Sequence, residues 1–187
     1  MRYWIDTEFI EDGKTIDLIS IGIVAEDGRE FYRINSDCDF SKANRWVQEN
    51  VIPQLPPQNH PSWIAKEAIA FEVMAFIKLP NWSDPTYEGF NHDYLKKLGM
   101  EERPEFWGYY ASYDWVVFCQ LFGAMIDLPT PFPMFINDIK QWCKQLGDPA
   151  LPKQGKKEHH ALVDARWNKE AWEFLRRFEE DCVVERV

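Results

Sequence analysis

The chain lacks any long apolar run. In its 187 residues, no stretch approaches the roughly 20 apolar residues that a transmembrane helix needs. The opening segment MRYWIDTEF enters a strand-like pattern at once and carries two acids where a signal peptide would have an apolar run. We therefore expect no membrane partner and a cytoplasmic location. With 45% hydrophobic and 16% aromatic residues, residues 1–187 have the composition of one globular domain.

Cysteine is scarce and widely spaced. The four residues are Cys38, Cys119, Cys143 and Cys182, with no CxxC pair and no histidine at zinc-finger spacing. This excludes a zinc-finger scaffold, and a chain of this size and expected compartment is not held together by disulfides. Cys119 and Cys143 lie in apolar stretches, so we expect them in the core.

Positive charge is also in short supply. Lysine and arginine number 21 against 31 acids, which gives a net charge of −10. That balance excludes a protein that holds long duplex nucleic acid by charge alone. A small active site remains compatible, because bound cations reverse the local field around acids. Basic residues also cluster locally, at Lys153, Lys156 and Lys157 and at Lys96 and Lys97.

The first part of the chain predicts a three-stranded antiparallel meander. Its strands are expected at residues 2–9, 16–25 and 29–34, separated by turns at Asp12-Gly13 and Asp27-Gly28. Apolar runs divided by Asp-Gly are a strong local signal for hairpins.

The rest of the chain predicts helices around a further strand. The order indicates an α/β fold, a mixed sheet of the meander plus parallel strands flanked by helices. The proline-bearing segment 53–61 predicts an extended loop, and the polar segment 80–104 an insertion. The other expected elements are a helix at 41–50 capped by Ser41, a helix at 62–78 capped by Ser62, a strand at 106–111, a helix from 112 or 113 to about 122, a helix at 137–147 ended by Gly147, and a last helix from about 160 through 180.

Two acids near the start of the chain are candidate site residues. On a strand, residues two apart project from one face at about 6.7 Å, so Asp6 and Glu8 point the same way and Thr7 the other. Trp4 and Phe9 flank them, and buried acids are costly unless neutralised. The pair therefore predicts either a metal site or a solvated edge strand.

Further titratable residues occur at element boundaries. Asp114 follows a buried strand at a junction with a helix, where side chains of α/β sheets commonly face a ligand crevice. It could equally be an acid stabilised by the first turn of a helix. Asp164 lies one turn into the last helix and His159 just before it, with His160 as a competing histidine.

Together these segments resemble a known family. The DTE of residues 6–8, the aspartate of SYDWVVF and the HHALVDA segment resemble the motifs of the DEDD 3′–5′ exonucleases of the RNase H-like superfamily, in the DEDDh subgroup marked by HxAxxD. The chain looks most similar to the small bacterial exoribonuclease branch first recognised in mycobacteria. The resemblance covers most of the chain except residues 80–104. Many relatives carry an asparagine about four residues before the second-motif aspartate, where this chain has Tyr110 to Tyr113, so that hydrogen-bonding role is unfilled here or met by another residue.

The resemblance implies a mechanism with two Mg²⁺ or Mn²⁺ ions, about 4 Å apart. Asp6 would bridge both ions, Glu8 and Asp164 would complete the nucleophile-side ion, and Asp114 would hold the other. His159 would take the proton from the attacking water. The substrate would be an RNA 3′ end, the products nucleoside 5′-monophosphates, and the assembly a homodimer.

Substrate contacts are expected beside these acids. Thr7 is assigned to this role, and Phe9 would wedge against the terminal base or pack in the core. Tyr113 or Trp115 would stack on a base. The alternatives are a DNA 3′–5′ exonuclease of the same fold, a catalytically silent nucleic-acid-binding module, and an acidic interaction protein with solvated carboxylates.

Overall fold

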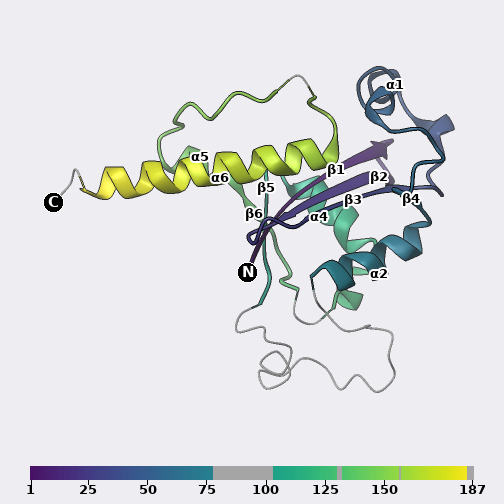
Figure 1. Ribbon diagram of the computed structural model, residues 1–187, viewed down its shortest axis with the longest axis horizontal. Coiled ribbons are helices and arrows are strands. Elements are labelled where there is room, and N and C mark those ends of the chain that lie inside the picture. Colours follow the sequence, from purple (N-terminus) through teal and green to yellow (C-terminus); the bar gives the residue numbers. More distant parts are fainter. Residues whose placement is uncertain (78–102, 130–131, 156, 185–187) are drawn as a thin grey trace.

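The structure is a computed structural model that describes residues 1–77, 103–129, 132–155 and 157–184 (Figure 1). The predicted insertion at 80–104 lies outside the described residues, apart from its last two positions. Within the described ranges, no helix has the length and apolar character needed to cross a membrane.

A six-stranded mixed sheet forms the centre of the fold, in the order β4-β3-β2-β1-β5-β6. The first three strands pair antiparallel, which confirms the predicted meander. The other three add parallel pairings, of β4 with β3, β5 with β1 and β6 with β5. The strands are β1 Arg2–Glu11, β2 Ile16–Ala25, β3 Glu30–Asn35, β4 Trp63–Ile64, β5 Glu105–Gly108 and β6 Asn137–Asp138.

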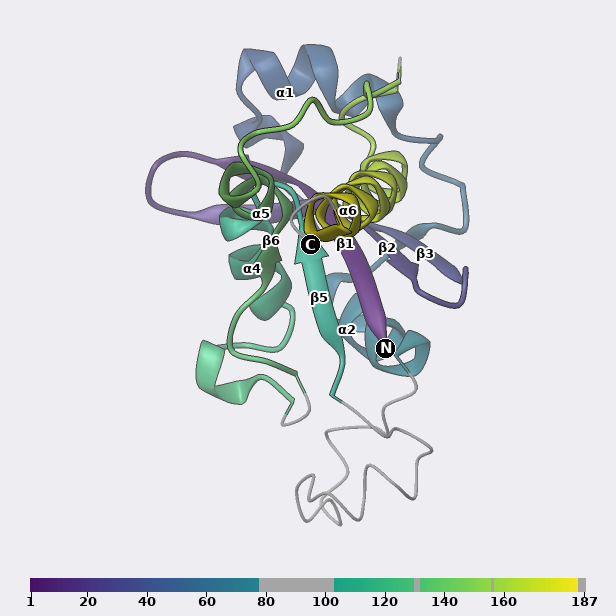
Figure 2. The same cartoon turned by 90° about the vertical axis from the view of Figure 1, so that its left-hand side faces the viewer.

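Helices cover both faces of the sheet, so the predicted α/β class is confirmed (Figures 1 and 2). Alternation along β1 supplies both cores: Tyr3 and Ile5 pack with α2 and α4, whereas Trp4 packs with α5 and α6. Fully burying one such large side chain contributes about 1.5–3 kcal/mol. The helices are α1 Arg45–Asn50, α2 Lys66–Phe76, α4 Ser112–Cys119, α5 Ile139–Gln145 and α6 Ala161–Val184.

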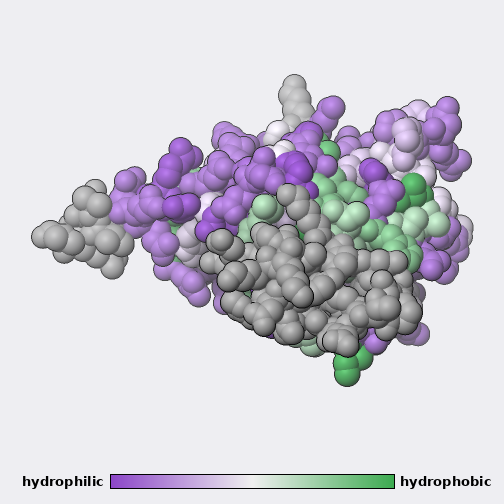
Figure 3. Space-filling model, turned by 60° about the horizontal axis from the view of Figure 1, so that its bottom comes forward, coloured by the Kyte–Doolittle hydropathy of each residue, from purple (hydrophilic) through white to green (hydrophobic). Residues whose placement is uncertain are grey.

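The longest helix, α6, is amphipathic. Its buried residues recur at three- and four-residue spacing, as Ala161, Ala165, Asn168, Trp172 and Leu175. Its other side is charged, and hydrophilic residues cover the C-terminal part of the helix at the left of Figure 3. The helix therefore lies with one stripe on β1 and β2 and the opposite stripe in solvent.

Two predicted helix starts are wrong. Ser41 lies in the short 3-10 helix Phe40–Lys42, and α1 is capped instead by Asn44, whose side chain accepts a hydrogen bond from the Val47 N–H at 2.9 Å. Ser62 caps no helix, because the two residues that follow it pair with β3 as β4, and α2 starts only at Lys66.

Other boundaries shift for similar reasons. The predicted strand 106–111 ends at Gly108, and the predicted helix 137–147 starts two residues late because its first residues pair with β5 as β6. The first residues of the loop predicted as extended at 53–61 belong to the 3-10 helix Ile52–Gln54. Another 3-10 helix, Met125–Asp127, follows α4. Cys119 and Cys143 are buried as predicted, and all four cysteines are free.

Candidate active site

The candidate site lies on β1 where the N-terminal ends of α4 and α6 meet the sheet (Figure 2). Strand alternation puts Asp6 and Glu8 on the same face as Trp4, the face that α6 covers. On the neighbouring strand, Asp6 pairs with Gly22 and Glu8 with Ser20. Because β1 is a central strand and Thr7 and Glu8 are buried, a solvated edge strand is excluded.

Gly22 lets α6 approach this part of the sheet. A Cβ atom at this position would lie 2.3 Å from the carbonyl oxygen of Ala161 and 2.4 Å from the backbone nitrogen of Leu162. Such distances cannot be relieved by a side-chain movement, because the atoms belong to the backbone. The missing side chain of Gly22 therefore allows the first turn of α6, which carries Asp164, to contact β2 beside Asp6.

Asp164 is held from two sides. Gln154 Nε2 donates to its Oδ1 at 2.8 Å, and the His159 N–H donates to its Oδ2 at 2.7 Å. His159 adopts a φ of 69°, a left-handed conformation that is uncommon for residues other than glycine. The bond from its own N–H helps to maintain this conformation and ties the entry of α6 to the carboxylate.

His159 is the histidine that faces the acids. Its imidazole and the carboxylates of Glu8 and Asp164 each offer a ligand atom, and these atoms lie within 4.8 Å of one another. Trp46 of α1 contacts the imidazole edge-on, with ring centroids 4.7 Å apart. His160 instead stacks on Tyr32 at 4.6 Å, and burial lowers its pKa.

Asp114 reaches the site from α4. The N–H and the Oγ1 of Thr7 both donate to its Oδ1, at 2.8 and 2.7 Å. The second oxygen, Oδ2, receives neither of these bonds. Thr7 therefore orients Asp114, from the side of the strand opposite to Asp6 and Glu8. Its contact with substrate stays a prediction.

Burial raises the pKa of all four carboxyl groups, and repulsion from the other acids of the cluster adds to this for Asp6 and Glu8. The pKa of Asp6 lies well above its usual value, through burial and the charges of Asp114, Glu8 and Asp164. Burial and the neighbouring aspartates raise the pKa of Glu8 to about 8. Burial raises the pKa of Asp114 to about 6, against the hydrogen bonds from Thr7, and burial also raises the pKa of Asp164. The four groups form one electrostatic unit with excess negative charge, which divalent cations would stabilise.

The predicted aromatic contacts divide into two groups. Phe9 and Tyr113 stack on each other with centroids 5.7 Å apart and planes 11° apart, and Tyr113 is 57% exposed. Trp115 lies elsewhere: it is buried and stacks on Phe118 in the core between the sheet, α2 and α4. Phe9 and Tyr113, the sequence neighbours of Glu8 and Asp114, thus stack on each other, and Trp115 supports the helix that carries Asp114.

Several supporting residues were missed from the sequence. Gly22 did carry a signal, since a glycine inside a strand pattern often marks a close backbone approach. Gln154, Trp46 and Asn168 carried none, because each contacts a distant segment; Asn168, for example, donates to the carbonyl oxygen of Ile5 at 2.8 Å.

Fold and site together define a class of protein, an α/β protein whose buried carboxylates and one histidine form a candidate catalytic centre for cation-assisted chemistry.

Comparison with known proteins agrees with an enzyme. Residues 1–176 match the family model described as 3′-5′ exoribonuclease Rv2179c-like domain. The chain is also 39% identical over 178 residues to two Mycobacterium tuberculosis proteins, covering 95% of this chain and 91% of each relative. These are 3′-5′ exoribonuclease MT2234.1 of strain CDC 1551 / Oshkosh and 3′-5′ exoribonuclease Rv2179c of strain ATCC 25618 / H37Rv. The chain belongs to the Rv2179c-like 3′-5′ exoribonuclease family.

Proposed function

We propose that this chain is a metal-dependent 3′–5′ exoribonuclease of the DEDDh type, which releases nucleoside 5′-monophosphates from RNA 3′ ends. The observation that carries the proposal is the convergence of Asp6, Glu8, Asp114, His159 and Asp164, from three separate segments, at one end of two helices. Family membership supports the choice of RNA.

The donor set fits hard divalent cations. Oxygen ligands dominate, as Mg²⁺ and Mn²⁺ prefer, and the pKa values of Asp6 and Glu8 are raised by burial and then by the charges of the neighbouring acids. Asp6, Glu8, Asp114 and Asp164 would hold two ions. Bound there, such ions would polarise the scissile phosphate and acidify a water molecule.

His159 would act as the general base. Its imidazole lies beside Glu8 and Asp164, so it can accept a proton from a water molecule that attacks the phosphate between these groups. The edge-on contact with Trp46 restricts the orientation of the ring. His160 is unsuited to this role, because it stacks on Tyr32 and its Nδ1 is buried.

Phe9 and Tyr113 would contact the 3′-terminal base. They are the sequence neighbours of Glu8 and Asp114, and their stacked pair leaves Tyr113 exposed, as in aromatic platforms that bind single strands without sequence preference. A homodimer and a cytoplasmic location belong to the same proposal, on the strength of the family resemblance.

Digestion of 5′-labelled single-stranded RNA and DNA, with Mg²⁺, Mn²⁺ or EDTA, tests the function. We expect a ladder of progressively shorter RNA that disappears with EDTA and with Asp6→Asn. His159→Ala should slow the reaction by roughly 10²–10⁴-fold. A matched His160→Ala variant should keep most of the activity.

Three outcomes would point elsewhere. Faster shortening of DNA than of RNA would favour a DNA exonuclease of the same fold. RNA binding without shortening under any metal would favour a silent binding module. Absence of both binding and metal-induced stabilisation would favour an interaction protein.

A further inference from the structure

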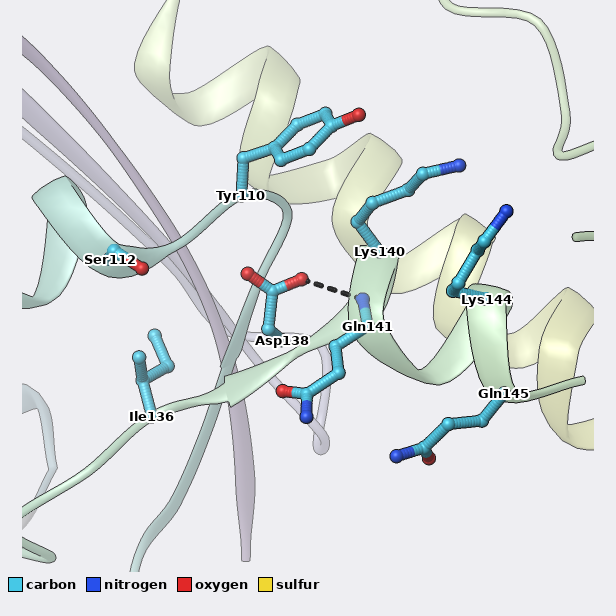
Figure 4. A pocket seen from close by; sticks show the side chains of 8 residues that line it. All are labelled: Tyr110, Ser112, Ile136, Asp138, Lys140, Gln141, Lys144 and Gln145. Atoms are coloured by element: carbon cyan, nitrogen blue, oxygen red, sulfur yellow. Dashed lines mark hydrogen bonds between the residues drawn. The ribbon is translucent and has the colours of Figure 1, made fainter.

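A cavity of about 660 Å³ lies between the N-terminal end of α4 and helix α5 (Figure 4). Its size falls within the usual range for ligand sites, about 300–1,000 Å³. Tyr110 and Ser112 border it on one side, and Lys140 and Lys144 on the other (Figure 4). A second hollow of about 310 Å³ shares part of its lining and adds the aromatic side chains of Trp107, Phe135 and Trp142.

The cavity adjoins the acidic cluster at Asp114. Ser112 precedes Asp114 by two residues in the same helix. Asp138, in the floor of the cavity, accepts a hydrogen bond from the Ala111 N–H at 2.9 Å, and its charge raises the pKa of Asp114. A chain whose 3′ end occupies the acidic cluster can therefore continue directly into this space. On the opposite side, Trp46 packs against His159.

Tyr110 is presented to solvent at the edge of the cavity. Its side chain is 64% exposed, and its φ is 55°. A positive φ is costly for an aromatic residue, and such conformations cluster at functional sites. An exposed aromatic ring held in this way is suited to stack on an unpaired base.

The opposite wall supplies positive charge. Lys140 and Lys144 both pair with Asp148, at 2.6 and 3.2 Å. The side chain of Lys144 is 72% exposed, and exposed pairs of this kind contribute little stability, so a phosphate can replace the carboxylate as its partner. Asp138 is the acid within the cavity, and two backbone N–H groups, of Ala111 and Gln141, partly offset its charge.

We propose that this cavity binds the single-stranded RNA upstream of the two 3′-terminal nucleotides, with Tyr110 stacked on a base and Lys140 and Lys144 on phosphate oxygens. The inference rests on the proposed function and assigns the path of the substrate away from the acidic cluster. It also explains how a chain with a net charge of −10 holds a polyanion, because the contact is confined to a small cationic wall.

Substrates of different length distinguish a defect in the cavity from a defect in the catalytic centre. The test compares kcat/KM on a dinucleotide and on RNA of about eight nucleotides, for the full chain with Mg²⁺. Tyr110→Ala should lower kcat/KM on the longer RNA by roughly 5- to 100-fold and leave the dinucleotide unchanged. Lys144→Gln should reduce the slope of log(kcat/KM) against log salt by about 0.7 on the longer RNA alone. Lys157→Gln, an equal change of charge on the His159 side, is the matched control and should leave the slope unchanged.

The contrary results are distinct. If Tyr110→Ala and Lys144→Gln process both substrates like the unsubstituted protein, or if Lys157→Gln alone changes the salt slope, the cavity does not hold the RNA. If the two variants lose dinucleotide cleavage to the same extent as cleavage of the longer RNA, they act on the catalytic centre instead, and the inference is again overturned. Failure of the unsubstituted protein to shorten any RNA would overturn the proposed function itself.

Discussion

Replacing Glu8 by glutamine should make the metal-free protein more stable at neutral pH. Glu8 is only 8% exposed, and burial with the charges of Asp164 and Asp114 raises its pKa to about 8 from an ordinary 4.5. Between these values the folded protein keeps the proton and the unfolded chain has lost it. Protonation therefore favours the folded state, and raising the pH removes this contribution.

The magnitude follows from proton linkage. While the folded state holds one more proton than the unfolded state, each pH unit lowers the free energy of unfolding by about 1.4 kcal/mol. From pH 5 to pH 7, Glu8 alone should cost the metal-free protein about 3 kcal/mol. For a domain of this size that corresponds to roughly 6–12 °C in melting temperature. Glutamine at position 8 does not titrate, so the Glu8→Gln variant does not lose this stability as the pH rises.

Urea unfolding of both proteins in EDTA, at about pH 5 and pH 7, measures the effect. The variant should gain about 3 kcal/mol on the unsubstituted protein between the two pH values. Comparing the two proteins cancels the titrating groups that do not interact with Glu8, such as His160, whose lowered pKa opposes the trend. An equal stability difference at both pH values would refute the reasoning, since Glu8 would then not be buried among like charges.

Three further predictions concern the surroundings of the acids. Gly22→Ala should lower the free energy of unfolding, measured with urea, by about 2–3 kcal/mol and abolish cleavage, because the new Cβ would meet the backbone of Ala161 at 2.3 Å. Gly155→Ala is the control for the urea measurement, because no atom lies within 4 Å of a Cβ at that position. Thr7→Val removes the Oγ1 donor to Asp114 and should reduce kcat/KM on RNA roughly tenfold or more, whereas Thr7→Ser should retain activity; equal rates for both variants would exclude the orienting role. Mg²⁺ or Mn²⁺ at about 100 times its dissociation constant should stabilise the protein by about 3 kcal/mol, which scanning calorimetry measures. If Asp6→Asn gained the same stability, the ions would bind elsewhere.

The meander was predictable because its signals are local. Asp-Gly turns separate apolar runs at residues 2–35, and both the strands and their antiparallel pairing follow from them. The wrong helix starts after Ser62 and before Ile139 have a different origin. Both displaced segments pair with distant strands as β4 and β6, and pairing of this kind leaves no mark in the local pattern.

The acids were predictable from their motifs, and their supports were not. Asp6, Glu8 and Asp164 stand in short patterns that can be read along the chain. The donor that holds a carboxylate need not be its neighbour in sequence. Thr7 donates a hydrogen bond to Asp114 across 107 positions, and Gln154 donates one to Asp164 from the loop before α6. Polar residues in such roles look like ordinary loop and strand residues until the fold brings them together.

The central claim is that the carboxylates hold divalent cations against the scissile phosphate of RNA. The most direct test is an RNA whose 3′-terminal linkage carries a phosphorothioate as a single diastereomer, digested with Mg²⁺ or Mn²⁺. Sulfur is a poor ligand for Mg²⁺ and a better one for the softer Mn²⁺. For one of the two diastereomers, we expect cleavage to be slow in Mg²⁺ and restored in Mn²⁺. Equal thio effects in the two metals for both diastereomers would contradict metal contact with the phosphate.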